Sequence, residues 1–141
     1  PFLRCLQTVN PFSVKSGLGI NVENTLQEVF FDPNFLLRPK SELNNLDKNI
    51  YNVNSNYRSL IPPNTLTYPE SEKSIEDRVT LFWKNIVKPN LDSNKNILVC
   101  SHMGIVNMLI KRTVEKNRGL KTFYPMGQIS KLDSKSVLYI N

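Results

Sequence analysis

The stretch that decides the fold is Ile97-Leu98-Val99-Cys100-Ser101-His102-Met103-Gly104, in which an apolar run ends abruptly at polar residues. Four apolar residues without alternation predict a strand buried on both faces, as in the middle of a parallel sheet. After it, apolar side chains from Ile105 to Val114 recur at helical spacing. Strand, tight turn and helix in this order predict an α/β fold, with a mostly parallel central sheet flanked by helices.

Further elements are predicted on both sides of this stretch. Apolar spacing over residues 3–9 predicts a short helix. A second helix is predicted from Ser74, where Ser74 and Asp77 resemble a capping box, up to Pro89. The remaining predictions are a strand at 20–22, a helix end near Gly119, and closing strands at Ile129 to Leu132 and Val137 to Ile140.

Length and composition predict one domain over 1–141, because 141 residues suit a single core. No apolar run reaches the roughly eighteen residues of a membrane-spanning helix, so no membrane association is predicted. The net charge of +6 is scattered, which favours solvated surface over nucleic-acid binding. Cys5 and Cys100 show no metal spacing and predict free thiols in a reducing compartment, with a cytoplasmic localisation. A single histidine argues against a zinc site.

The segment 32–68 has weak periodicity and four prolines. Such a long irregular segment predicts an insertion, here a substrate lid. Arg38, Lys40 and Arg58 could meet a negatively charged substrate there, and ordinary surface positions are the alternative.

Three polar side chains are candidates for chemistry. His102 follows the predicted strand and opens a helix, where ligands of α/β sheets bind and where free N–H groups favour an anion; Gly104 would let the backbone approach it. Arg4 has apolar neighbours and therefore needs a carboxylate or phosphate partner. Glu28 precedes Val29-Phe30-Phe31, which predicts a raised pKa suited to a general acid. Taken singly, a structural histidine, an ordinary salt bridge and a solvent-facing glutamate are the alternatives.

Together these residues stand in motifs that resemble the histidine phosphatase (phosphoglycerate-mutase-like) superfamily. The motifs, in the family's order, are Pro1-Phe2-Leu3-Arg4-Cys5-Leu6-Gln7-Thr8, Ile20-Asn21-Val22-Glu23 followed by Leu26-Gln27-Glu28, Glu70-Ser71 with Arg78, Ile97 to Gly104, and Met126 to Leu132. They cover nearly the whole chain. The residues of the first motif are similar to those in the branch that contains the suppressor of T-cell signalling phosphatases and protozoan mutase-like proteins.

The resemblance implies covalent phosphoryl transfer, in which the histidine of an Arg-His-Gly turn attacks phosphorus and forms a phosphohistidine. Arg4 would bind the phosphoryl oxygens, and Glu28 would protonate the leaving oxygen. His102 would donate to the phosphoryl group, with Met103 and Gly104 beside it in the substrate-binding turn. The resemblance implies neither a metal nor another cofactor.

The sequence departs from the family at the nucleophile, because His102 is its one histidine. The family's Arg-His-Gly turn lies upstream of the segment that begins here at Pro1, on a first central strand that this chain lacks. Without that strand, an apolar strip and unpaired strand edges would be exposed. We expect the nucleophile upstream of Pro1. The alternatives are that another segment takes the place of the missing strand, or that the fragment is inactive.

The predicted function is that of a phosphomonoester hydrolase acting on a phosphorylated small molecule or a phosphoprotein. A phosphoglycerate mutase is the first alternative, although Met103-Gly104 stands where dedicated mutases typically have Gly-Asn, which favours a phosphatase. A non-catalytic module that binds phospho-ligands is the second. The sequence leaves open the physiological substrate and whether the protein is a homodimer.

Overall fold

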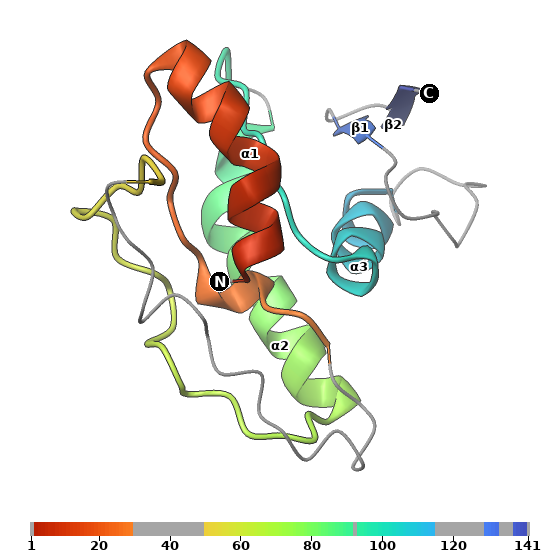
Figure 1. The fold of residues 1–141 in the computed structure, drawn as a ribbon. Helices are drawn as coiled ribbons and strands as arrows, with labels where there is room; N and C mark the ends of the chain where they lie inside the picture. Colours follow the sequence, from red (N-terminus) through yellow and green to blue (C-terminus); the bar gives the residue numbers. More distant parts are fainter. Residues whose placement is uncertain (1, 30–49, 92, 115–128, 133–136, 141) are drawn as a thin grey trace.

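The computed structural model describes residues 2–29, 50–91, 93–114, 129–132 and 137–140 (Figure 1). Its elements are α1 (Leu3–Ser16), the 3-10 helix η1 (Asn24–Leu26), α2 (Glu72–Phe82), the π-helical η3 (Trp83–Val87), the 3-10 helix η4 (Lys88–Asn90), α3 (Met103–Val114), β1 (Ile129–Leu132) and β2 (Val137–Ile140). None of the helices within these ranges is long and apolar enough to cross a membrane.

Helix α1 confirms the helix predicted at the start of the chain and is longer than expected. It follows Phe2, whose side chain gives no cap hydrogen bond, and it ends at Gly17. Gly17 has φ 72°, a left-handed conformation that glycine adopts without steric penalty and that commonly ends helices. Leu6 is buried on the inner face of α1. The helix thereby fixes where Arg4 and Cys5 lie.

Helix α2 begins earlier than the sequence predicts. Its N-cap is Ser71, whose Oγ accepts a hydrogen bond from the Ser74 backbone N–H at 3.2 Å. The prediction of a capping box at Ser74 and Asp77 was therefore wrong. Ser74 lies inside the helix, and its hydroxyl donates to Glu70 at 3.1 Å. The helical run continues through η3 and η4 to Asn90, so Pro89 lies in its last turn.

The hydrophobic core lies where α2, η1 and α3 meet. Its buried members are Leu26, Ile75, Val79, Phe82, Ile105 and Leu109. The apolar face predicted for the helix that starts near Ile105 is thus confirmed. Because each such side chain contributes roughly 1.5–3 kcal/mol when fully buried, this cluster holds η1 and the start of α3 together. Glu28 follows η1 and His102 precedes α3, so the core brings these two segments side by side.

Residues 97–100 differ from the prediction. They have no regular secondary structure, and Ile97 and Leu98 are 44% and 60% exposed. Their predicted burial on both faces was therefore wrong for this structure. A central strand needs hydrogen-bonded neighbours on both edges, and no described strand pairs with this segment. The mostly parallel central sheet stays a prediction.

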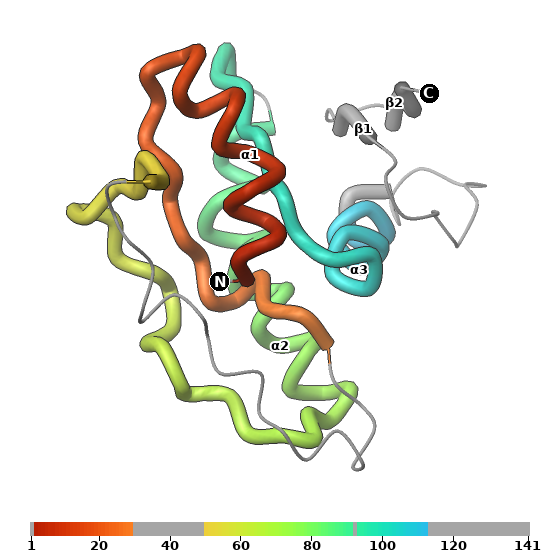
Figure 2. Tube along the Cα trace, viewed as in Figure 1, coloured from red at the N-terminus to blue at the C-terminus, as the bar shows by residue number. Residues whose placement is uncertain are grey.

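The two closing strands are confirmed. β1 and β2 pair antiparallel, with a register that runs from Ile129 opposite Ile140 to Leu132 opposite Val137. The strand predicted at 20–22 is reduced to one parallel bridge between Ile20 and Val53. Figure 2 shows this stretch of chain running beside the segment that starts at residue 50. The predicted helix end near Gly119 lies outside the described residues.

Part of the predicted insert 32–68 is described, from residue 50 onward. Arg38 and Lys40 lie outside the described residues. The guanidinium of Arg58 donates to the carbonyl oxygens of Ser55 and Tyr57, at 2.8 and 3.3 Å. Arg58 therefore bonds its own loop, and a lid function for 32–68 stays a prediction.

Candidate active site

Arg4, Glu28 and His102 meet in one cluster although they are far apart in sequence. Glu28 Oε2 lies 3.1 Å from Arg4 Nη2 and 3.0 Å from His102 Nδ1, and Arg4 Nη2 lies 3.0 Å from the same ring nitrogen. The amino-terminal guanidinium and the imidazole are therefore in contact. What each side chain does there remains a prediction.

The protonation of His102 decides which of these contacts are hydrogen bonds. Burial lowers the pKa of His102, but hydrogen bonds to Cys5 and Glu28 and their negative charges outweigh burial and raise it. In the protonated ring, Nδ1–H donates to Glu28 and Nε2–H points to Cys5 Sγ at 3.6 Å. A guanidinium cannot accept a hydrogen bond, so Arg4 then shares the Glu28 oxygen with the ring and does not bond to the ring itself.

Glu28 is ionised more readily than the sequence predicts. Burial of the carboxyl raises its pKa, but hydrogen bonds from His102 and the Val29 backbone N–H, with the charges of His102 and Arg4, produce a net lowering. The prediction of a raised pKa was therefore wrong for the site as it stands. It considered the apolar neighbours in sequence and missed two cations that only the fold brings there.

The exposure of the three side chains differs. The His102 side chain is 4% exposed, that of Glu28 25% and that of Arg4 59%. Arg4 has the carboxylate partner that its apolar neighbours predict, Glu28, but its side chain is largely exposed and its guanidinium lies over the Phe2 ring, 5.0 Å from the centroid. The Phe2 ring also packs against His102: the two rings meet edge to face, with their centroids 5.1 Å apart. An exposed arginine above a buried histidine leaves the cluster open to solvent on one side.

The turn after residue 100 presents His102 to the cluster. The Ser101 hydroxyl donates to the Leu26 carbonyl oxygen at 2.9 Å, which ties this turn to the end of η1. The His102 carbonyl accepts from the Val106 N–H at 2.9 Å, the first bond of α3. Met103 is 39% exposed at the start of that helix. A Cβ on Gly104 would make ordinary contact with Val29 at 3.6 Å, so Gly104 packs against the residue that follows Glu28.

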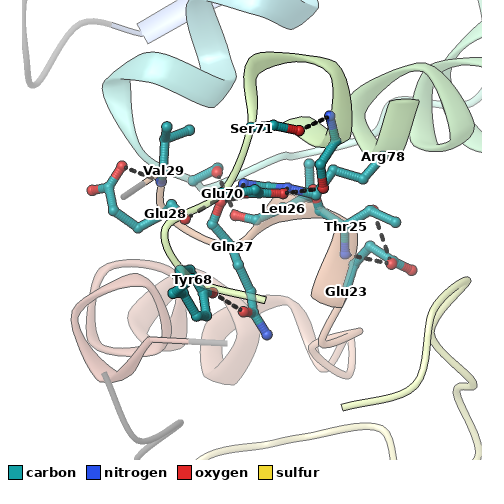
Figure 3. A network of polar contacts seen from close by, with 12 residues as sticks. Glu23, Thr25, Leu26, Gln27, Glu28, Val29, Tyr68, Glu70, Ser71 and Arg78 are labelled. Carbon is teal, nitrogen blue, oxygen red and sulfur yellow. Dashed lines mark hydrogen bonds and ion pairs between the residues drawn. The ribbon is translucent and has the colours of Figure 1, made fainter. Parts of the chain in front are cut away.

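A buried ion pair holds the segment that carries Glu28 (Figure 3). The Arg78 guanidinium donates to Glu70 Oε1 at 2.7 Å and to Oε2 at 2.9 Å, and both side chains are almost inaccessible. The same guanidinium donates to the carbonyl oxygens of Thr25, Gln27 and Glu28, at 2.6, 2.8 and 3.4 Å. Arg78 therefore links α2 to the backbone of Glu28 and of the residues just before it. The sequence marked Glu70 and Arg78 only as parts of a motif.

Glu23 anchors the same segment at its other end. Its buried carboxylate accepts from the Thr25 N–H and hydroxyl, at 3.0 and 2.9 Å, and caps η1. It also accepts from the Tyr57 hydroxyl at 2.6 Å and from Ser59 at 2.7 Å. Burial raises the pKa of Glu23, but these donors lower it overall. Sequence reasoning missed this role, because Tyr57 and Ser59 become neighbours of Glu23 only in the fold.

Cys5 is a contact of the site that the sequence did not indicate. Its sulfur lies 3.6 Å from His102 Nε2. Both cysteines are free and half-buried. They also line a groove of about 570 Å³ between α1 and residues 96–100, whose walls are mostly apolar. The groove therefore opens next to the inner face of the cluster.

Comparison with known proteins gives one finding. The family model described as histidine phosphatase superfamily (branch 1) matches residues 1–135, a range that contains all three members of the cluster. Searches of curated proteins and of solved structures each found no match.

Proposed function

Because the chain belongs to the histidine phosphatase superfamily (branch 1), we propose that it forms the phosphate pocket of a phosphomonoester hydrolase that works through a phosphohistidine. The observation that carries this proposal is the cluster itself. Two cationic side chains, Arg4 and His102, share one carboxylate oxygen at 3.1 and 3.0 Å. A phosphoryl group offers the same negative oxygens to the same donors, and Arg4 can bind two of them at once.

In this proposal the Glu28 carboxylate is bonded to the two cationic side chains, Arg4 and His102, until a phosphoryl group binds. The incoming oxygens take over the hydrogen bonds of Arg4 and His102, and Glu28 loses the contacts that lower its pKa. A carboxyl group beside a phosphate dianion has a raised pKa, because like charges disfavour its ionised form. Glu28 is then protonated in the complex and can donate to the leaving oxygen; after transfer it accepts a proton from water.

The nucleophile of this proposal is a histidine outside the 141 residues. His102 is the only histidine of the chain, and both of its ring nitrogens already face hydrogen-bond partners, Glu28 and Cys5. A ring that donates from both nitrogens has no free lone pair to attack phosphorus. The apolar groove beside Cys5 supports the proposal, because an apolar strand with the Arg-His-Gly turn would bury its side chains there.

The substrate class proposed is a phosphorylated small molecule or phosphoprotein in a reducing compartment such as the cytoplasm. The residues from Leu3 to Thr8 support a place in the branch with the suppressor of T-cell signalling phosphatases and protozoan mutase-like proteins. A non-catalytic module that binds phospho-ligands is the second candidate, because the chain has side chains suited to bind phosphate but a single histidine, and none for the attack on phosphorus.

The test is hydrolysis of p-nitrophenyl phosphate by a polypeptide that carries this chain together with the nucleophilic histidine. Turnover is expected, with a burst that reports the covalent intermediate, and His102→Ala should reduce kcat/KM at least 100-fold, as is usual for a lost transition-state donor. Arg112→Gln, in a partly exposed pair with Glu76 at 3.2 Å, is the control that should keep full activity. Full activity of His102→Ala would refute the pocket, whereas phosphate binding without turnover would favour the binding module.

A further inference from the structure

Phe2 is a buried aromatic residue that contacts both of the side chains proposed to bind the phosphoryl group. The guanidinium carbon of Arg4 lies over the Phe2 ring, 5.0 Å from its centroid. The centroids of the Phe2 and His102 rings are 5.1 Å apart, and the two ring planes are at 89° to each other. One ring therefore contacts two groups that are 98 positions apart in the sequence.

The position of the Phe2 ring is set by the start of α1 and by burial. The Phe2 carbonyl oxygen accepts from the backbone N–H groups of Cys5 and Leu6, at 3.0 and 3.4 Å, so its backbone is fixed by the first helical turn. The residue is 7% exposed, and its ring borders both the apolar groove and the cluster. Because packing restricts a buried ring to one conformation, Phe2 presents a rigid surface to its neighbours.

The contact with Arg4 is electrostatic as well as apolar. The face of a phenyl ring carries partial negative charge, so it attracts a guanidinium without accepting a conventional hydrogen bond from it. The Arg4 side chain is 59% exposed, and such a long side chain has many conformations available in solvent. Phe2 therefore restricts the guanidinium to a place above the cluster and does not occupy its N–H donors.

The proposed reaction requires a contact of this kind. In the structure Glu28 accepts from both Arg4 and His102, and in the proposed function these donors pass to the phosphoryl oxygens. Glu28 therefore cannot keep the two side chains in place once phosphate binds. The Phe2 ring is neutral and does not compete with phosphate, so its contacts with both side chains can persist in the complex.

We propose, on the basis of the proposed function, that Phe2 is a positioning residue of the phosphate pocket. Its ring keeps Arg4 and His102 in the geometry that binds a phosphoryl group when Glu28 releases them. The apparent affinity for a ligand falls with the fraction of the protein in the binding-competent conformation. A cation–π contact at an exposed site changes such a conformational equilibrium by roughly two- to fivefold, which sets the size of the expected effect.

The sharpest test changes the charge distribution of the ring and keeps its shape. Two variants carry a difluorinated or a trifluorinated phenylalanine in place of Phe2, because fluorine withdraws electron density from the ring face and adds little volume. Calorimetry measures the binding of inorganic phosphate to the polypeptide that carries this chain together with the nucleophilic histidine. The Kd should rise with each added fluorine, by roughly three- to fivefold for the trifluorinated ring, while the free energy of unfolding in urea changes little.

Phe82 provides the matched control. It is a buried ring of the hydrophobic core, 3% exposed, on α2. The trifluorinated residue in place of Phe82 should leave the Kd for phosphate unchanged. Phe2→Leu removes the ring altogether and should weaken phosphate binding at least as much as trifluorination does. Since Phe2→Leu also changes the packing, the fluorinated variants decide between a structural and an electrostatic role.

A second readout is the NMR signal of the Arg4 side chain. Protons above the face of an aromatic ring are shielded, so the resonances next to the Arg4 guanidinium should lie upfield of their ordinary positions and return there in Phe2→Leu. The upfield position should persist at saturating phosphate. Its loss on phosphate binding would overturn the claim that the ring holds Arg4 in the complex.

The outcomes separate this role from the proposed function. If the wild type binds phosphate and the fluorinated variants at Phe2 bind it equally well, the role of Phe2 is overturned and the proposed function stands. An equal loss of affinity from fluorination of Phe82 would overturn the role as well. If the wild type does not bind inorganic phosphate, the proposed function fails, and the positioning role fails with it.

Discussion

Replacing Arg78 by methionine should destabilise the protein more than any surface charge change. The substitution keeps a long side chain in place but removes five donors from a site where both members of the ion pair are at most 3% exposed. Glu70 would then be a buried carboxylate without its cation. The carbonyl oxygens of Thr25, Gln27 and Glu28 would lose a donor as well.

The magnitude follows from this geometry. Breaking a buried pair by removing one partner is destabilising by about 3–5 kcal/mol, because the remaining charge stays desolvated. Among the described residues, Glu70 then keeps only the Ser74 hydroxyl, at 3.1 Å, which cannot replace two charged hydrogen bonds. We therefore expect the free energy of unfolding of Arg78→Met to fall by about 4 kcal/mol. A protein of this size has about 5–15 kcal/mol in total, so the variant would be marginal.

Urea unfolding followed by circular dichroism measures the loss. Arg112→Met is the matched control, because it removes the same residue type from an exposed pair with Glu76, and it should change the free energy of unfolding by at most about 1 kcal/mol. Glu70→Gln combined with Arg78→Met removes the unpaired charge and should recover part of the loss. If Arg78→Met does not fold, Arg78→Lys keeps the charge with fewer donors and should lie in between.

The result that would refute this reasoning is equal stability of Arg78→Met and Arg112→Met. It would mean that Arg78 does not hold the Glu28 segment. A related readout is the pKa of His102, which depends on Glu28: in Arg78→Lys it should fall from its raised value if the segment loosens.

Further predictions concern the titrating groups around the site. Glu28→Gln should lower the pKa of His102, measured by NMR titration of the single histidine; an unchanged value would contradict the pairing. Glu28 has a lowered pKa, so its stabilisation is full above its unfolded value of 4.5 and is lost as pH falls through the folded pKa. The pKa of His102 is raised, so its stabilisation is full below 6.5 and is lost as pH rises through the folded pKa. The double variant Glu28→Gln/His102→Gln should therefore fall furthest below the wild type in stability between pH 4.5 and 6.5, and a constant difference across pH would count against the pair. Tyr57→Phe should lower stability by about 1–3 kcal/mol in urea unfolding, because buried Glu23 loses a donor at 2.6 Å; a loss below about 0.5 kcal/mol would speak against that bond.

The elements that follow from local pattern were predictable. Helical spacing located α1, α2 and α3, because this signal needs no distant neighbour, and short apolar-rich stretches indicated β1 and β2. The boundary of α2 was missed, since Ser71 and Ser74 are both good N-caps and only the side chain of Glu70 decides between them. The segment 97–100 was misjudged, because burial of a strand depends on partners from elsewhere.

The candidate site was predictable in its members and not in its electrostatics. Motif order brought Arg4, Glu28 and His102 into one hypothesis, and the structure places them within 3.1 Å of one another. The pKa of Glu28 depends on two cations that are distant in sequence, so its apolar neighbours alone gave the wrong sign. The contact between Cys5 and His102 likewise requires the packing of α1 against the turn after residue 100.

The most direct test of the account titrates the reduced chain with inorganic phosphate while the NMR resonances of the His102 ring are followed. The account predicts a saturable shift of these resonances that is lost in Arg4→Gln and kept in Arg112→Gln. A ring that does not respond to phosphate, or one that responds equally in Arg4→Gln, would contradict the claim that these two side chains hold a phosphoryl group.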